Sequence, residues 1–135
     1  MSDAIARLGT EWAPRLLSAL RIVAGLIIFL HGCQKLLGFP PPTGAMPSPF
    51  TLFWFAGVVE LFGGGLILLG LFTRQAAFIA SGEMAFAYFI AHAPRNLVPT
   101  LNGGNAVILW CFVFLYLVAA GPGPWSLDAI LRKKT

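Results

Sequence analysis

Apolar residues gather in four long runs along the chain, separated by short segments rich in proline, glycine and charge. The runs cover residues 16–37, 51–72, 75–92 and 105–120. A hydrocarbon core of about 30 Å is crossed by about 20 helical residues, so two runs are long enough and two are slightly short. The pattern therefore predicts an all-α fold: an integral membrane four-helix antiparallel bundle forming a single domain over residues 1–135.

The residues between the runs agree with this division. Pro14 suits the first turn of a helix, where its missing N–H costs nothing. Five prolines within Phe39–Phe50 exclude a helix there and predict a stiff, extended loop. Thr73 and Arg74 are predicted to form a tight hairpin between the second and third spans, and residues 121–124, Gly-Pro-Gly-Pro, end the fourth.

Composition and charge exclude a soluble domain and favour one orientation. Hydrophobic residues make up 58% of the chain and charged residues 10%, against about 25% charged in a typical soluble domain. The net charge of +4 does not indicate nucleic-acid binding, because the basic residues lie near the ends of the spans. One side would carry Arg7, Arg15, Arg74, Arg132, Lys133 and Lys134, and the other Arg95 with Lys35 near its boundary. The positive-inside rule then predicts that both termini are cytoplasmic.

Two glutamates, Glu60 and Glu83, interrupt otherwise apolar spans. An ionised side chain at mid-bilayer costs roughly 2.5 to above 10 kcal/mol, so such a residue must be paired, protonated or hydrated. Glu60 shares a helix face with Gly57, Gly63 and Gly64, and small residues mark packing faces in membranes. We therefore expect a polar pocket inside the bundle.

The charges near the spans sum to zero, which predicts specific pairs. Judged by depth in the membrane, Arg21 is expected to pair with Glu83, and either Lys35 or His31 with Glu60. Together they would form a polar column through the bundle. Two interpretations stay open: the pairs only specify the fold, or they form a functional site.

Histidines and cysteines supply the remaining candidate chemistry. His92 follows Tyr88 by four residues and so shares its helix face, while His31 lies on another span. Two histidines without a binding motif favour hydrogen-bonded side chains over a metal or haem site, and a role in proton transfer stays open. Cys33 and Cys111 lie at similar depths and would form a redox-active thiol pair if their helices touch; otherwise they are small buried residues.

Several segments together resemble the DoxX family of small four-helix membrane proteins. They are HGCQKL at 31–36, GVVELFGG at 57–64, LGLFTR at 69–74, GEMAFAY at 82–88, HAP at 92–94, NGG at 102–104 and GPGPWSLD at 121–128. The family commonly has Glu directly after Asn-Gly-Gly, where this chain has Asn105. The resemblance implies a multi-pass protein of the bacterial inner membrane, linked to quinone-coupled sulfur oxidation, quinone detoxification or thiol and oxidative stress.

Three hypotheses for function follow. The first is a membrane subunit or accessory protein of a quinone- or thiol-linked redox system, with quinone as the candidate ligand and a soluble or membrane protein as redox partner. The second is a small transporter or proton-coupled channel subunit, which would need to form a homo-oligomer. The third is a non-catalytic membrane adaptor for a soluble redox partner. The chain carries no flavin, nicotinamide, haem or iron–sulfur motif, so the sequence does not decide whether it is an enzyme.

Overall fold

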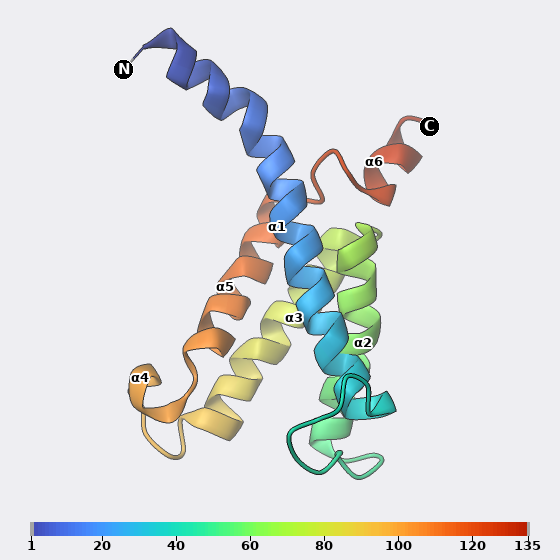
Figure 1. The fold of residues 1–135 in the computed structure, drawn as a ribbon, viewed down its shortest axis with the longest axis vertical. Helices are drawn as coiled ribbons and strands as arrows, with labels where there is room; N and C mark the ends of the chain where they lie inside the picture. Colours follow the sequence, from blue (N-terminus) through green and yellow to red (C-terminus); the bar gives the residue numbers. More distant parts are fainter. Residues whose placement is uncertain (1, 135) are drawn as a thin grey trace.

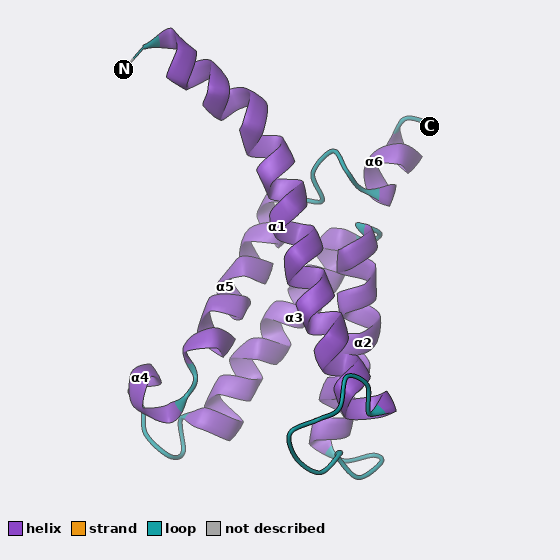
Figure 2. Ribbon diagram, viewed as in Figure 1, coloured by secondary structure: helices purple, strands orange, loops and turns teal. Residues whose placement is uncertain are grey.

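The computed structural model describes residues 2–134, which form helices and no strand. The longer helices of this part are α1 (Asp3–Leu37), α2 (Leu52–Leu69), α3 (Thr73–Ala87) and α5 (Asn105–Ala120). The shorter elements are the π-helix η1 (Tyr88–His92), α4 (Pro99–Asn102) and α6 (Leu127–Arg132). Figure 1 labels the helices, and Figure 2 separates them from the loops. The all-α prediction is confirmed for these residues.

The longer helices form two pairs. α1 packs along α2, α3 packs along α5, and α2 also contacts α3. Figure 1 shows the pairs close together near the two chain ends and splayed apart at the opposite end, where the loop 38–51 and α4 lie. The buried core where the pairs meet consists of Ala24, Ile28, Ile67, Ala76, Ala77, Ala80, Met84, Phe114 and Leu117.

Glycines allow α1 and α2 to touch along their backbones. A Cβ atom built on Gly32 would lie 2.3 Å from the backbone nitrogen of Leu61, and one on Gly64 would lie 2.5 Å from that of Phe29. No real side chain fits such gaps, so this contact requires glycine at both positions. Gly63 departs from the predicted packing face, because a Cβ there would meet nothing within 4 Å.

Two local predictions are wrong. α1 begins at Asp3, so Pro14 lies inside the helix and not in its first turn. A proline inside a helix removes one backbone hydrogen bond and favours a kink, and the first part of α1 leans away from the rest (Figure 1). α3 begins at Thr73, so residues 70–72 form the turn that was assigned to Thr73 and Arg74.

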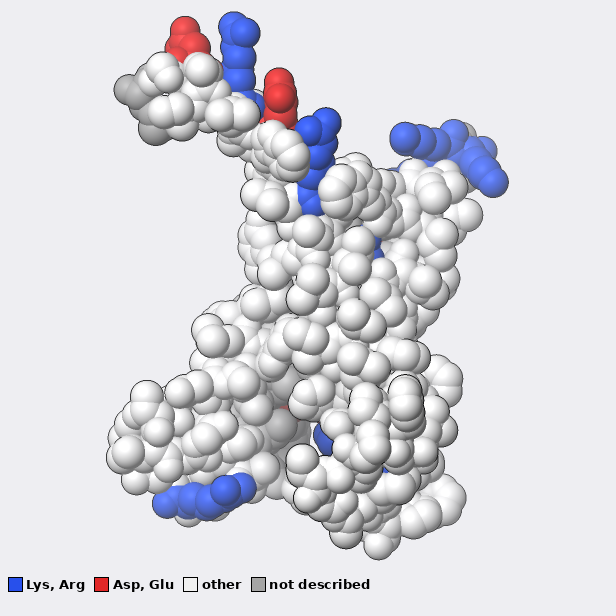
Figure 3. All heavy atoms as spheres, viewed as in Figure 1, with Lys and Arg blue, Asp and Glu red and all other residues white. Residues whose placement is uncertain are grey.

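Two helices of the described residues, α1 and α2, are long and apolar enough to cross a membrane, and α5 is a shorter apolar helix. By length and composition, the structure therefore supports two of the four predicted spans. Figure 3 shows most of the visible Lys and Arg side chains at the end of the molecule that carries both chain termini. This distribution has the asymmetry that the sequence predicted.

Candidate functional site

The main cavity lies between the two helix pairs, in the part of the molecule where they splay apart. Its volume is about 490 Å³, and most of its lining is apolar and aromatic. The polar side chains at its wall are those of His31, Lys35, Glu60, Glu83 and His92. These five residues come from α1, α2, α3 and η1, so the cavity brings together most of the polar residues singled out in the sequence.

Lys35 and Glu60 form an ion pair across the α1–α2 contact. Lys35 Nζ donates a hydrogen bond to Glu60 Oε1 at 2.8 Å and lies 2.8 Å from Oε2 as well. The Glu60 side chain is 5% exposed, against 29% for Lys35. The sequence left Lys35 and His31 as alternative partners of Glu60, and the structure shows Lys35 in that place. The pairing with His31 is wrong, because His31 lies exposed at the cavity edge.

Glu83 faces the same cavity from α3 without a cation of its own. Its Oε2 atom is buried and accepts no hydrogen bond from any of residues 2–134. It lies close enough to Glu60 and Lys35 to interact electrostatically with both. The cavity therefore holds two carboxyl groups and one ammonium group.

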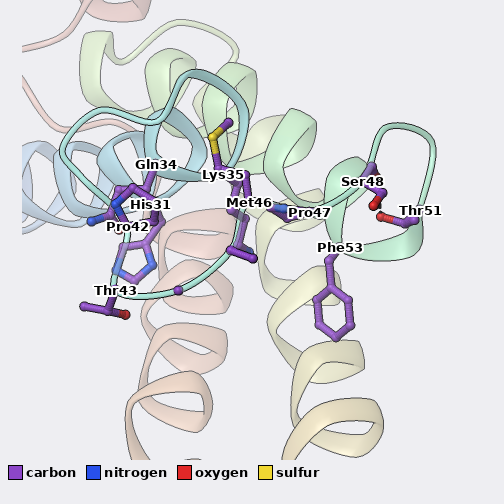
Figure 4. Close-up of a pocket in the computed structure, with 12 residues that line it drawn as sticks. His31, Gln34, Lys35, Pro42, Thr43, Met46, Pro47, Ser48, Thr51 and Phe53 are labelled. Atoms are coloured by element: carbon purple, nitrogen blue, oxygen red, sulfur yellow. Dashed lines mark hydrogen bonds between the residues drawn. The ribbon is translucent and has the colours of Figure 1, made fainter.

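A second hollow adjoins the cavity on the side of the proline-rich loop. Its volume is about 520 Å³, and it shares His31, Lys35 and Phe53 with the main cavity. Figure 4 shows His31 and Lys35 beside the loop that carries Thr43 and Met46. The shared residues place the two hollows next to each other, with His31 and Lys35 between them.

Arg21 does not pair with Glu83, so that prediction is wrong. The Arg21 side chain is fully buried at the other end of the bundle, where it is surrounded by backbone carbonyls. Nε donates to Pro122 O at 2.7 Å, Nη1 donates to Ile67 O at 2.7 Å and Leu68 O at 2.6 Å, and Nη2 donates to Trp125 O.

These bonds have a clear physical origin. The C-terminal end of α2 carries a partial negative charge and unpaired carbonyls, which attract a cation. Buried Ala24 and Ile28 separate Arg21 from the cavity along the same helix. The predicted continuous polar column is therefore wrong as well.

Tyr88 and His92 organise the loop between η1 and α5. Tyr88 Oη donates to Leu97 O at 2.7 Å, and His92 Nδ1 lies 3.0 Å from Asn102 O. Because a carbonyl only accepts hydrogen bonds, His92 Nδ1 is the donor in this contact. Tyr88 is not part of the cavity wall, whereas His92 is.

Asn102 is the centre of this loop, and the sequence did not identify it as a site residue. Its Nδ2 donates to Asn96 O at 2.6 Å and to Tyr88 Oη at 3.3 Å, and its Oδ1 accepts from Gly104 N at 2.7 Å. The sequence signal that points to it is the Asn-Gly-Gly run at 102–104, which enters the sequence analysis only through the resemblance to the DoxX family. Asn102 thereby fixes η1 relative to α5 at the edge of the cavity.

The two cysteines are free thiols. Cys33 is buried on α1. Cys111 lies on α5, where its backbone carbonyl accepts a hydrogen bond from Ser81 Oγ at 2.8 Å. The structure contains no bond between the two sulfurs, and the redox pair has no support from it. Within residues 2–134 no three His, Cys, Asp or Glu side chains are grouped so that they could hold a metal ion.

Asp128 on α6, outside the long apolar helices, stabilises the start of α3. Its carboxylate accepts hydrogen bonds from Phe72 N and Thr73 N, both at 3.0 Å. Burial alone would raise the pKa of Asp128, but the hydrogen bonds from Thr73 and Phe72, aided by the charge of Arg132, outweigh it and lower the pKa. No sequence signal connects residues so far apart in the chain.

Comparison with known proteins gives one family and several relatives. The model of the DoxX family matches residues 16–93, more than half of the chain. An uncharacterized protein of Haemophilus influenzae is 44% identical over 92% of this chain and 96% of its own. The inner membrane protein YphA of Escherichia coli is 32% identical over 85% of this chain and 89% of its own. The inner membrane protein YqjF of Escherichia coli is 30% identical over 84% and 90%. No solved structure matches this chain.

Proposed function

The chain belongs to the DoxX family, and from that premise we propose that it is a multi-pass protein of the bacterial inner membrane whose cavity binds a quinone headgroup. In this proposal it is the membrane subunit or accessory protein of a quinone- or thiol-linked redox system. A soluble or membrane partner protein supplies the electrons. The observation that carries the proposal is a largely apolar cavity whose wall holds one lysine and two glutamates.

The proposed topology has four spans with both termini in the cytoplasm. The first two are α1 and α2, the third is α3 together with η1, and the fourth is α5. The concentration of Lys and Arg at the end that carries the termini supports this orientation. α5 is short for a span, and a short span is accommodated by local thinning of the bilayer. The names of two relatives as inner membrane proteins support the location.

The cavity fits a flat, mainly apolar molecule with a polar edge. Ligand sites commonly have volumes of about 300–1,000 Å³ and apolar walls with a few polar groups, and this cavity has about 490 Å³. Phe53, Phe86 and Trp110 offer aromatic surfaces to a planar ring. Lys35 can donate to a ring oxygen from within its ion pair, and the apolar wall suits a hydrocarbon tail.

The acidic groups of the cavity suit proton transfer. Reduction of a quinone takes up two electrons and two protons. If all three groups were ionised, Lys35, Glu60 and Glu83 would carry one net negative charge, and a single proton neutralises the cluster. Glu83 Oε2 has no hydrogen-bond partner among the described residues. In this proposal it forms a hydrogen bond with the ligand, as donor when the carboxyl group is protonated and as acceptor when it is ionised. His31 is exposed where the two hollows adjoin, so in this proposal it passes protons between water and the cavity.

Quinone binding to the purified full-length chain tests the proposal. In lipid nanodiscs, a short-chain quinone should raise the melting temperature, and a hydrocarbon tail without a headgroup should not. Glu83→Gln should weaken the quinone response several-fold. Glu11→Gln is the matched control, because Glu11 is an exposed glutamate far from the cavity.

The proposal fails if the native protein co-purifies with no quinone and shows no headgroup-dependent rise in melting temperature. It also fails if the two glutamate variants respond alike. The transporter hypothesis lacks a corresponding observation, since apolar core residues separate the cavity from Arg21 and the opposite end of the bundle.

A further inference from the structure

The first part of α1, residues 3–16, forms an arm that projects beyond the bundle (Figure 1). Every residue of this arm is exposed. Its large apolar side chains are Ile5, Leu8, Trp12 and Leu16, with exposed fractions of 54%, 54%, 48% and 61%. At about 100° per residue these four positions fall on a single narrow stripe. An apolar stripe on an arm outside the core is a contact surface without its partner.

A row of charges runs along one flank of the stripe. Its members follow at intervals of four residues and alternate in sign: Asp3, Arg7, Glu11 and Arg15. The other flank carries small side chains, those of Ala6, Gly9 and Ala13. The arm therefore has an apolar centre, one charged edge and one edge that allows close approach.

We propose that this arm pairs with the same arm of a second copy of the chain in antiparallel orientation. In an antiparallel helix pair, equivalent flanks of the two helices face each other. The charged row of one copy therefore meets the charged row of the other, with Asp3 opposite Arg15 and Arg7 opposite Glu11. Every charge then faces an opposite charge, and Ile5 lies near Trp12 of the second copy. In a parallel pair the charged flank of one copy would face the small residues of the other, so no opposite charges would meet.

The proposed pair is compatible with two chains in one membrane. Such chains are related by a two-fold axis along the membrane normal, so antiparallel arms must lie close to the membrane plane. The arm already leans to one side of the bundle in Figure 1. The proline inside α1 removes a backbone hydrogen bond, so it marks the point where the helix would bend further toward the membrane plane in the pair. In the pair the two Arg15 residues would lie about 18 Å apart along the helix axes. This distance is near the width of two packed helices, so it leaves room for the bodies of the two chains side by side. This arrangement depends on the proposed topology but not on the proposed ligand.

The charge pattern favours a second copy over a lipid surface. Helices that bind membrane surfaces carry an excess of Lys and Arg on their polar face, whereas this row has no net charge. A pair of such short helices would be marginal in water. Anchoring both arms to one membrane raises their effective concentration, which compensates for the small contact area.

Cysteine cross-linking in liposomes at low protein density tests the geometry. In a Cys33→Ala, Cys111→Ala background, Leu8→Cys places a thiol on the stripe near the two-fold axis. Thr10→Cys is the matched control, since it lies at the same level but on the opposite face of the helix. We expect several-fold more disulfide-linked dimer from Leu8→Cys than from Thr10→Cys. Equal yields, or no dimer from either variant, would overturn the proposal.

Charge exchange tests the identity of the partner by single-molecule dimer counting in the same liposomes. Arg7→Glu and Glu11→Arg should each lower the dimer fraction several-fold, and the double exchange should restore it. A lipid-bound arm would give a different result, because Glu11→Arg would strengthen its attachment to anionic vesicles. Failure of the double variant to recover, or an unchanged dimer fraction in the single variants, would refute pairing between copies. The arm lies outside the core, so the melting temperature of each variant should stay unchanged.

Discussion

Gly32→Ala is the sharpest test of how the α1–α2 contact supports the cavity. The new methyl group would lie 2.3 Å from Leu61 N and 2.8 Å from the carbonyl carbon of Glu60. Both atoms belong to the backbone of a packed helix, so they cannot rotate away as a side chain would. To reach even 3.0 Å, the two helices must separate by about 0.7 Å at this point.

The expected cost follows from two opposing effects. Overpacking costs typically 1–3 kcal/mol, and a contact with backbone belongs at the upper end of that range. Alanine regains about 0.5–1 kcal/mol through its higher helix propensity. The net loss of unfolding free energy is therefore about 2 kcal/mol, or a fall of roughly 5–10 °C in melting temperature. The separation also lies one turn from Lys35, so the proposed quinone binding should weaken together with stability.

Thermal unfolding in nanodiscs measures this effect, and Gly63→Ala is its control. Gly63 lies in the same helix, but a Cβ there meets nothing within 4 Å. This variant should be as stable as the wild type or slightly more stable. If Gly32→Ala unfolds at the wild-type temperature, or if both variants lose the same amount, the backbone contact does not hold the two helices as described.

Three further substitutions test other parts of the structure. Arg21→Lys should lower the unfolding free energy by at least about 2 kcal/mol, because a lysine cannot make the same set of charged hydrogen bonds; wild-type stability in chemical denaturation would contradict it. The lowered pKa of Asp128 means that its contribution is present above the unfolded pKa, near 4, and is lost as pH falls through the lower folded pKa. Asp128→Asn should therefore be less stable at pH 7 and lose less stability than the wild type between pH 5 and pH 2, and parallel pH profiles of melting temperature would refute this. Asn102→Ala should release the loop at residues 93–104, which hydrogen exchange would detect as faster amide exchange there, and unchanged exchange would disprove its anchoring role.

Local features of the sequence predicted the α1–α2 half of the site. Glycines at intervals of seven mark the contact face of each helix, and Lys35 and Glu60 lie on those faces at matching depth. Charge, periodicity and rise per residue place Glu60 beside this end of α1, but they leave Lys35 and His31 as alternative partners, and the structure decides for Lys35. Glu83 was correctly placed in the interior, although its predicted partner was wrong.

The features that the sequence missed depend on contacts between distant segments. The carbonyl partners of Arg21 include Pro122 and Trp125, which reach it only because the chain turns back after α5. Asp128 binds the start of α3 across a similar distance in sequence. Hydropathy also marks where a helix can enter lipid rather than where it begins, which is why the start of α1 at Asp3 was missed.

The carbonyl cage around Arg21 has a consequence for biogenesis. When the first helix leaves the ribosome, its guanidinium group has none of the oxygen atoms that later surround it, and two of them are made more than a hundred residues afterwards. The charge must therefore remain hydrated or bound to lipid headgroups until the segment after α5 has been made and has folded back onto Arg21. Completion of the fold is thus coupled to the end of translation, and a chain cut short before Pro122 would expose an unsatisfied cation to membrane proteases.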